Sequence, residues 1–114
     1  MPEYMKKDLS DDAFEILGEQ FKAFSEPMRL KLVYTLMDGE KTVSELVEET
    51  RGLQANVSKH LRMLLEAGIV ERRKQGLNSY YSIADESVFE LCDLMCNSIQ
   101  GRLEADLGSF SASN

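Results

Sequence analysis

The chain has 114 residues, is 43% hydrophobic and has a net charge of −7. This length provides one domain with a modest core and excludes two. No apolar run is long enough to cross a bilayer, and no signal-peptide segment follows the first residues, so we expect a cytoplasmic protein without a membrane partner. The two cysteines are then not expected to form a structural disulfide.

The N-terminal part predicts two helices after a flexible segment, 1–10. From Asp11 to Phe24, apolar side chains recur at three- and four-residue steps, which makes a stripe too rich for a surface helix. Ser25-Glu-Pro27 then provides an N-cap and a proline in the first turn. The second helix starts there, is ended by Gly39, and is expected to belong to the core.

Residues 42–68 predict two more helices that are joined by a short turn. Thr42-Val-Ser-Glu45 has the spacing of a capping box, and Arg51-Gly52 ends the helix that follows it. The next helix has an apolar inner face and stops at Gly68. Its other faces and its leading end carry polar side chains: Gln54, Asn56, Ser58, Lys59, His60 and Arg62.

Residues 69–83 predict a β-hairpin, because two β-favouring runs flank a Gly-Leu-Asn turn. Tyr80 and Tyr81 must point to opposite faces of their strand, so one of them is expected to pack on the core. The order of helix, turn, helix and hairpin is the outline of a winged helix-turn-helix.

The last predicted helix runs from Asp85 to about Leu107 and has an apolar stripe that includes Cys92 and Cys96. The middle helices already supply a core, so the apolar stripes of 11–24 and 85–107 are surplus to it. Two such stripes at opposite ends of a domain, 11–107, favour a two-fold interface between two copies. The polar tail, 108–114, is expected to fray.

The charge is distributed unevenly along the chain. Residues 51–80 hold six basic and two acidic side chains, whereas the segments before and after have net charges of −6 and −5. The basic segment coincides with the second helix of the motif and the hairpin, where it would attract phosphate. The alternative is that Arg72-Arg73-Lys74 is only a solvated strand edge.

These segments resemble the ArsR/SmtB family of bacterial winged-helix repressors. Residues 56–64 read Asn-Val-Ser-Lys-His-Leu-Arg-Met-Leu; Glu-Ala-Gly-Ile-Val follows at 66–70, and Tyr-Tyr-Ser-Ile at 80–83. The resemblance spans residues 20–95. It implies a mainly α fold with a small β-hairpin, a homodimer through the first and last helices, and a transcriptional repressor that binds double-stranded DNA.

Docking geometry then assigns roles on DNA. The N-terminal half of the recognition helix can enter the major groove, where Gln54 and Asn56 could read base edges. Ser58, Lys59, His60 and Arg62 complete the expected helix contacts, and Arg73, Lys74 and Asn78 are the expected wing contacts. A dimer predicts an operator with an imperfect inverted repeat. The alternative for His60 is a half-buried ring bonded to a neighbouring backbone group.

The family's two known metal sites are absent from this sequence. Thr42-Val-Ser-Glu-Leu46 stands where the thiolate site would read Cys-Val-Cys-Asp-Leu, and Ser87 stands where the C-terminal zinc site would have its first histidine. What remains is Cys92-Asp-Leu-Met-Cys96, whose spacing places both thiols on one helix face. They could bind a soft metal ion or arsenite, or react with an oxidant or sulfur species, and either event could release DNA. Alternatively, both cysteines are small buried hydrophobes, and another ligand controls the protein.

Two other classes of function fit the sequence less well. An enzyme would need a nucleophile with a base or a phosphate-binding loop, and the chain has one histidine and no such loop; we therefore expect no catalysis. A winged helix that binds partner proteins is the stronger rival, because the chain is acidic overall.

Overall fold

The structure, a computed structural model, describes residues 7–106. Within that range the chain forms five α-helices, one 3-10 helix and a three-stranded antiparallel sheet. In chain order these are α1 (Asp11–Ala23), α2 (Pro27–Thr35), η1 (Leu36–Asp38), β1 (Lys41–Thr42), α3 (Val43–Thr50), α4 (Gln54–Glu66), β2 (Val70–Gln75), β3 (Asn78–Ile83) and α5 (Ser87–Asp106). The tail predicted at 108–114 and the first six residues of the predicted N-terminal segment lie outside the described residues.

The core lies between α2, α3 and α4. Its apolar side chains are at most 1% exposed and come from all three helices and η1: Leu32, Val33, Leu36, Leu46, Val57, Leu61 and Leu64. The base of the hairpin closes one side of this core with Val70 and Tyr81. Burial of such side chains removes apolar surface from water and is the main force that holds α4 against the other helices. Of the two tyrosines, Tyr81 is therefore the one that packs on the core, as the alternation predicted.

The helix boundaries around the predicted motif are confirmed. Thr42 and Glu45 form the capping box of α3, and Arg51 ends this helix in the left-handed conformation. Gly68 has a φ of +76° after α4, where its N–H bonds to the Leu65 carbonyl and the next N–H bonds to the Leu64 carbonyl. This pair of hydrogen bonds forms a Schellman motif, which favours glycine at that position.

Two details at the start of the core differ from the sequence-based expectations. The N-cap of α2 is Glu26 and not Ser25, because the Glu26 carboxylate accepts a hydrogen bond from the Met28 N–H at 2.9 Å. The Ser25 hydroxyl instead donates to the Lys22 carbonyl and closes α1. The sheet also has a strand that the sequence did not predict: Lys41 and Thr42 pair with Tyr81 and Tyr80 of β3.

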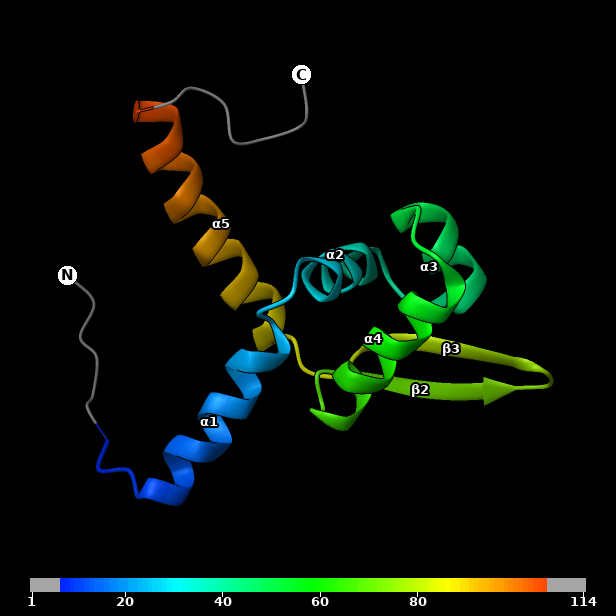
Figure 1. The fold of residues 1–114 in the computed structure, drawn as a ribbon, viewed down its shortest axis with the longest axis horizontal. Coiled ribbons are helices and arrows are strands. Elements are labelled where there is room, and N and C mark those ends of the chain that lie inside the picture. Colours follow the sequence, from blue (N-terminus) through cyan, green and yellow to red (C-terminus); the bar gives the residue numbers. More distant parts are fainter. Residues whose placement is uncertain (1–6, 107–114) are drawn as a thin grey trace.

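Helices α1 and α5 leave the compact body on the side opposite the hairpin tip, in a splayed arrangement (Figure 1). The first contacts the end of α4 through a hydrogen bond from Gln20 to the Ala67 carbonyl at 2.6 Å. The second starts beside the core with the buried Val88. None of the helices within residues 7–106 combines the length and apolar character that crossing a membrane requires.

Candidate nucleic-acid interface

The recognition helix α4 presents a continuous polar face to solvent. Val57, Leu61 and Leu64 are fully buried and fix the opposite face against the core. Five of the six predicted contact residues on this helix are exposed: Gln54, Asn56, Ser58, Lys59 and Arg62. Lys59 and Arg62 are one turn apart, so the two cations lie on neighbouring positions of the exposed face. This surface can approach phosphates and base edges.

The turn before α4 is tightly packed. A β-carbon on Gly52 would lie 2.8 Å from the Val57 methyl group and 3.1 Å from the Met28 methyl group. Glycine thus allows the close approach of α3 and α4 that a helix-turn-helix requires. No side chain caps the first turn of α4, and no acidic residue lies there. The helix dipole at this end therefore favours an anion such as phosphate.

His60 is the exception among the predicted contact residues. The residue is only 7% exposed, with Nε2 3.2 Å from a Glu26 carboxylate oxygen and Nδ1 3.2 Å from an Arg29 nitrogen. Position 60 lies on the inner face of α4 together with Val57 and Leu64, so the ring points into the domain. This position is unfavourable for the predicted DNA contact. It also differs from the alternative interpretation, because His60 is buried and not half-buried, and its partners are side chains and not backbone groups.

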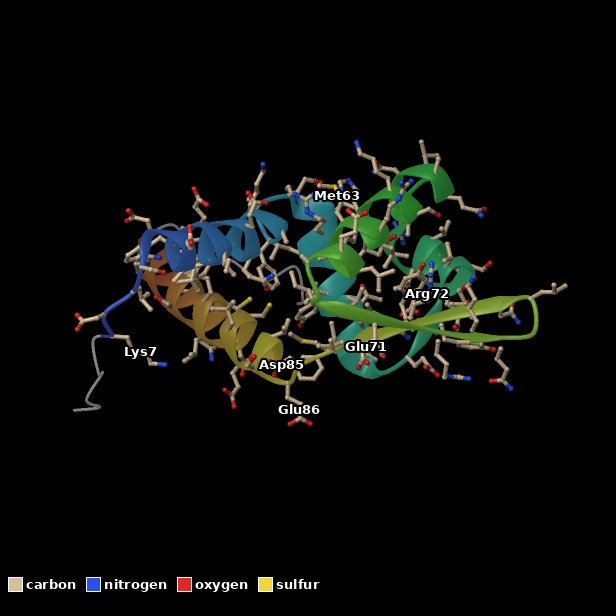
Figure 2. The ribbon with its side chains drawn as sticks, turned by 90° about the horizontal axis from the view of Figure 1, so that it is seen from below. Lys7, Met63, Glu71, Arg72, Asp85 and Glu86 are labelled. Carbon is tan, nitrogen blue, oxygen red and sulfur yellow. The ribbon has the colours of Figure 1, made fainter. Side chains whose placement is uncertain are left out.

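The wing has two faces with different chemistry. Paired residues on antiparallel strands share a face, and β2 pairs Val70 with Ile83, Arg72 with Tyr81 and Lys74 with Ser79. Because Val70 and Tyr81 are buried against the helices, Arg72 and Lys74 extend from the same face. Figure 2 shows Arg72 and its neighbour Glu71 on opposite sides of the hairpin.

Arg72 was not among the predicted wing contacts, although it is exposed and shares a face with Lys74. The signal that could have identified it is strand alternation. Counting in steps of two from the apolar Val70 places Arg72 and Lys74, and not Arg73, on the helix-facing side.

Arg73 lies on the other face and is already engaged. Its Nε and Nη2 atoms donate to the two carboxylate oxygens of Glu40 at 3.0 and 2.7 Å, and its guanidinium carbon lies 4.6 Å from the centre of the Tyr80 ring. The hydrogen bond from Arg73 lowers the pKa of Glu40, and the same bond raises the pKa of Arg73. Asn78, at the start of β3, is exposed on this face too.

Acidic side chains surround the far end of α4. A groove between α1 and the C-terminal half of α4 is lined by four acidic and two basic side chains, with Met63 among its apolar residues: Asp12, Glu15, Glu19, Glu66, Lys22 and Arg29. The carboxylates outnumber the cations in this groove, and negative charge repels phosphate. This end of α4 is therefore unfavourable for DNA. The N-terminal half, with Lys59 and Arg62 near it, is the favourable end.

The two splayed helices expose apolar surface of a kind that single soluble domains rarely leave uncovered. Phe14 is 58% exposed, Phe21 60% and Leu94 70%. Leu17, Leu91 and Met95 belong to the same stripes and are also exposed. This surface lies away from the hairpin tip, at the opposite end of the domain (Figure 1).

Cys92 and Cys96 are free thiols, and both are half-buried on α5. Cys92 packs against the core, and this burial, followed by the charges of Cys96 and Asp93, raises its thiol pKa. Within residues 7–106, no three His, Cys, Asp or Glu side chains of one chain come together in a way that could hold a metal ion. A single copy therefore offers a thiophilic ligand two sulfur donors.

The architecture and the exposed basic face define a winged helix-turn-helix of the DNA-binding class, and comparison with known proteins agrees. Residues 26–72 match the family described as "Bacterial regulatory protein, arsR family". An uncharacterised HTH-type transcriptional regulator of Methanocaldococcus jannaschii is 36% identical over 74% of this chain and 96% of its own length. A homolog of the cadmium resistance transcriptional regulatory protein CadC, from Staphylococcus aureus, is 37% identical over 77% of this chain and 74% of its own length.

A solved structure shows the same fold. The homodimeric winged helix-turn-helix DNA-binding domain of a possible ArsR-family regulator from Mycobacterium bovis superposes with a TM-score of 0.77, at 28% identity, over 87% of this chain and 94% of that one. The chain belongs to the arsR family of bacterial regulatory proteins, and it is a DNA-binding transcriptional regulator.

Proposed function

We propose that this regulator represses transcription as a homodimer that binds an inverted-repeat operator, without a catalytic step. The observation that carries the proposal is the separation of two surfaces on one small domain. The exposed basic and amide side chains of α4 and β2 lie at one end, and the uncovered apolar stripes of α1 and α5 lie at the other. A dimer through the apolar end would present two recognition helices to one side of a duplex.

The contacts on DNA divide by chemistry. Gln54 and Asn56, on the first turn of α4, have amides that can make paired hydrogen bonds to adenine edges in the major groove. Ser58, Lys59 and Arg62 on α4, and Lys74 with Arg72 on the wing, are suited to phosphates. We expect Asn78, at the wing tip, to lie near the sugar-phosphate backbone of DNA. Arg73 joins this set only where phosphate displaces Glu40.

Two observations support the dimer interface: the apolar surface that α1 and α5 expose, and the oligomeric state of a similar protein. The exposed aromatic and aliphatic side chains of α1 and α5 would each lose water contact on pairing, and burial of one such side chain contributes roughly 1.5–3 kcal/mol. The M. bovis relative of the same fold is described as homodimeric. We assign the dimerisation surface to 11–24 and 85–107.

The experiment is a binding-site selection from a random DNA library, followed by fluorescence anisotropy and sedimentation. We expect the selected sequences to form an imperfect inverted repeat whose half-sites lie about one DNA turn apart. The complex should contain two chains per duplex. Selected sites without two-fold symmetry, or one chain per duplex, would contradict the proposal.

A thiol-based sensor at Cys92 and Cys96 is a second, finer proposal for how DNA is released. It is favoured by their spacing: both thiols lie on one face of α5, the helix assigned to the dimer, so a dimer would bring four sulfurs to its interface. A soft metal ion takes three or four such donors. The raised pKa of Cys92 and its packing on the core support the rival interpretation, in which the cysteines are structural.

A titration of the reduced protein on its selected duplex separates the two interpretations. Cd(II), arsenite and a polysulfide are added in turn, and Cys92→Ser and Cys96→Ser serve as controls. The sensor proposal expects release by one of these reagents that is abolished in at least one serine variant. Release that neither variant changes, or no release at all, would leave the cysteines as core residues and assign control to another ligand.

A further inference from the structure

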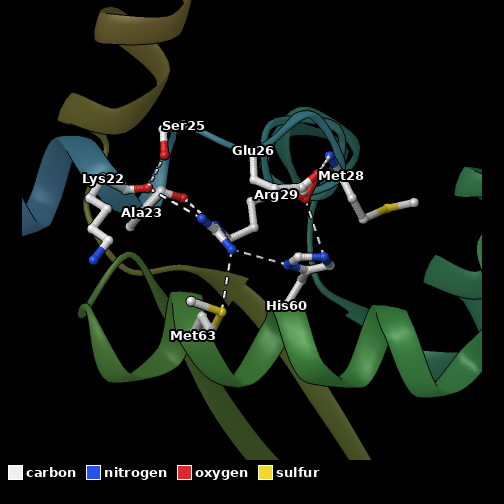
Figure 3. Close-up of polar contacts among 8 residues, drawn as sticks. All are labelled: Lys22, Ala23, Ser25, Glu26, Met28, Arg29, His60 and Met63. Atoms are coloured by element: carbon white, nitrogen blue, oxygen red, sulfur yellow. Dashed lines mark hydrogen bonds and ion pairs between the residues drawn. The ribbon is translucent and has the colours of Figure 1, made fainter.

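A buried polar network joins three helices behind the recognition surface. Arg29 of α2 and His60 of α4 are each only 7% exposed. The Arg29 guanidinium reaches His60 Nδ1 at 3.2 Å, and Glu26 at the start of α2 reaches His60 Nε2 at 3.2 Å (Figure 3). Among the described residues, no buried side-chain nitrogen or oxygen is left without a hydrogen-bond partner.

The chemistry of the partners fixes the proton on the ring. A guanidinium can only donate hydrogen bonds, so Nδ1 must accept, and the proton of the neutral ring then lies on Nε2. The Nε2–H group then donates a hydrogen bond to the Glu26 carboxylate. The other Glu26 oxygen accepts the Met28 N–H and caps α2. Each of the two ring nitrogens is therefore committed to one neighbour.

The same arginine also holds the end of α1. Its Nε donates to the Ala23 carbonyl at 2.8 Å and its Nη2 donates to the Lys22 carbonyl at 3.3 Å. These carbonyls belong to the last turn of α1; the Lys22 carbonyl also accepts from the Ser25 N–H and hydroxyl, so the bond to the Ala23 carbonyl is the contact that Arg29 adds by itself. Arg29 thus connects the C-terminal end of α1 directly to the middle of the recognition helix. The hydrogen bond from Gln20 to the Ala67 carbonyl connects α1 to the end of the same helix.

We propose that Arg29 and His60 are positioning residues that couple the dimer helix α1 to the recognition helix α4. The inference rests on the proposed dimer, because α1 is the helix whose apolar stripe we assign to the partner copy. Buried hydrogen bonds of this kind are costly to break. A shift of α1 therefore either carries α4 with it or breaks the Arg29–His60 bond. Pairing of two copies through α1 would in this way set the orientation of both reading helices.

The two amide substitutions of His60 separate this role from simple space filling. Asparagine places its amide oxygen near the position of Nδ1, where it can still accept from Arg29, whereas glutamine extends toward the position of Nε2 and loses that bond. Arg29→Lys retains the charge but cannot reach the α1 carbonyls and His60 together. Thr50→Val is a matched control: it removes a buried hydrogen bond of 2.6 Å to the Leu46 carbonyl within α3, outside the network.

The measurement is the affinity of each variant for the duplex selected by the parent protein, with free energies of unfolding from denaturant titration. We expect His60→Gln and Arg29→Lys to bind about tenfold more weakly, as the loss of roughly 1.4 kcal/mol of coupling predicts. His60→Asn and Thr50→Val should stay within about threefold of the parent. Where His60→Gln does not fold, Arg29→Lys provides the test.

Hydrogen exchange supplies a readout that stability alone would not change. The amides of Phe24 and Ser25 bond to the last turn of α1, so DNA binding should slow their exchange in the parent and in His60→Asn but not in His60→Gln or Arg29→Lys. Equal affinity and equal exchange in the two His60 variants would overturn the inference. Failure of the parent itself to bind any selected duplex would instead refute the proposed function.

Discussion

The two ends of this domain use opposite chemistry. At one end, α4 and β2 expose cations and amides, while Val57, Leu61, Leu64 and Val70 are buried against the core. At the other end, α1 and α5 expose aromatic and aliphatic side chains, with acidic residues beside them. An acidic chain can therefore bind DNA, since what matters is where its few cations lie and not the net charge. The same comparison assigns the uncovered apolar end to a second copy.

Disrupting the exposed apolar stripe of α1 should have the largest effect on DNA affinity. Phe21→Asp places a charge in the stripe of α1 that we assign to the dimer, so we expect a monomer whose affinity for an inverted repeat falls about 100-fold or more, because the two half-sites no longer act together. Ile16→Asp is the control, since Ile16 is 66% exposed on the other side of α1 and lines the acidic groove. Sedimentation and anisotropy measure both variants. A dimeric Phe21→Asp protein would contradict the assignment.

The basic end is tested by removing its cations from α4. Lys59→Ala and Arg62→Ala should each weaken DNA binding about tenfold, the usual scale for a charged hydrogen bond. The slope of log affinity against log salt should become shallower by about 0.9 for each phosphate that the variant no longer binds. Glu66→Gln, at the acidic end of the same helix, should leave the affinity unchanged or slightly higher. Unchanged affinity in both cation variants would refute the α4 surface.

The two faces of the wing sharpen the comparison. Arg72→Ala should weaken binding about tenfold, because the variant can no longer bind a phosphate from this position. Arg73→Ala should cost about threefold or less, because Glu40 already engages that side chain. Glu40→Gln provides the complementary test, since it releases Arg73 and should raise the affinity. The same anisotropy assay ranks the three variants, and an Arg73→Ala defect larger than that of Arg72→Ala would reverse our assignment of the faces.

The smallest expected effect concerns the start of α3. Thr42→Ala removes a helix cap and should lower the free energy of unfolding by about 1 kcal/mol. The hydrogen bonds from the Thr42 backbone and hydroxyl lower the pKa of Glu45. This stabilisation is therefore complete above the ordinary glutamate range and is lost as the pH falls through the lowered pKa. Denaturant titrations should show the difference between the two proteins shrinking at acidic pH, where the Thr42 hydroxyl no longer donates to a carboxylate, while the part that comes from the Glu45 N–H bond to the Thr42 hydroxyl oxygen persists. Equal stability of the two proteins at every pH would argue against the capping box.

Local patterns were sufficient to predict most of the fold. Capping residues, glycine stops and apolar periodicity placed the helices because each of these signals acts within a few residues of the element it bounds. The third strand was missed because two residues, Lys41 and Thr42, carry no periodicity of their own. They form a strand only because β3 offers them a free edge.

The interface could be predicted less completely, and His60 and Arg73 show why. Both are polar residues in a basic segment. Helical periodicity and strand alternation can place them on a face of their element, but they cannot identify the partners of either side chain. Their actual partners, Arg29 and Glu40, lie 31 and 33 residues away in the chain. A contact of that separation depends on how the helices and sheet pack, which the pattern around either residue does not contain.

The salt dependence of DNA binding tests the central claim most directly. Affinity for the selected duplex is measured by fluorescence anisotropy over a series of salt concentrations. A dimer with several phosphate contacts per copy predicts a log-log slope of about −5 or steeper, at roughly −0.9 for each contact. A winged helix that binds partner proteins would give a slope near zero and no preference for the selected sequence, and that result would contradict the account.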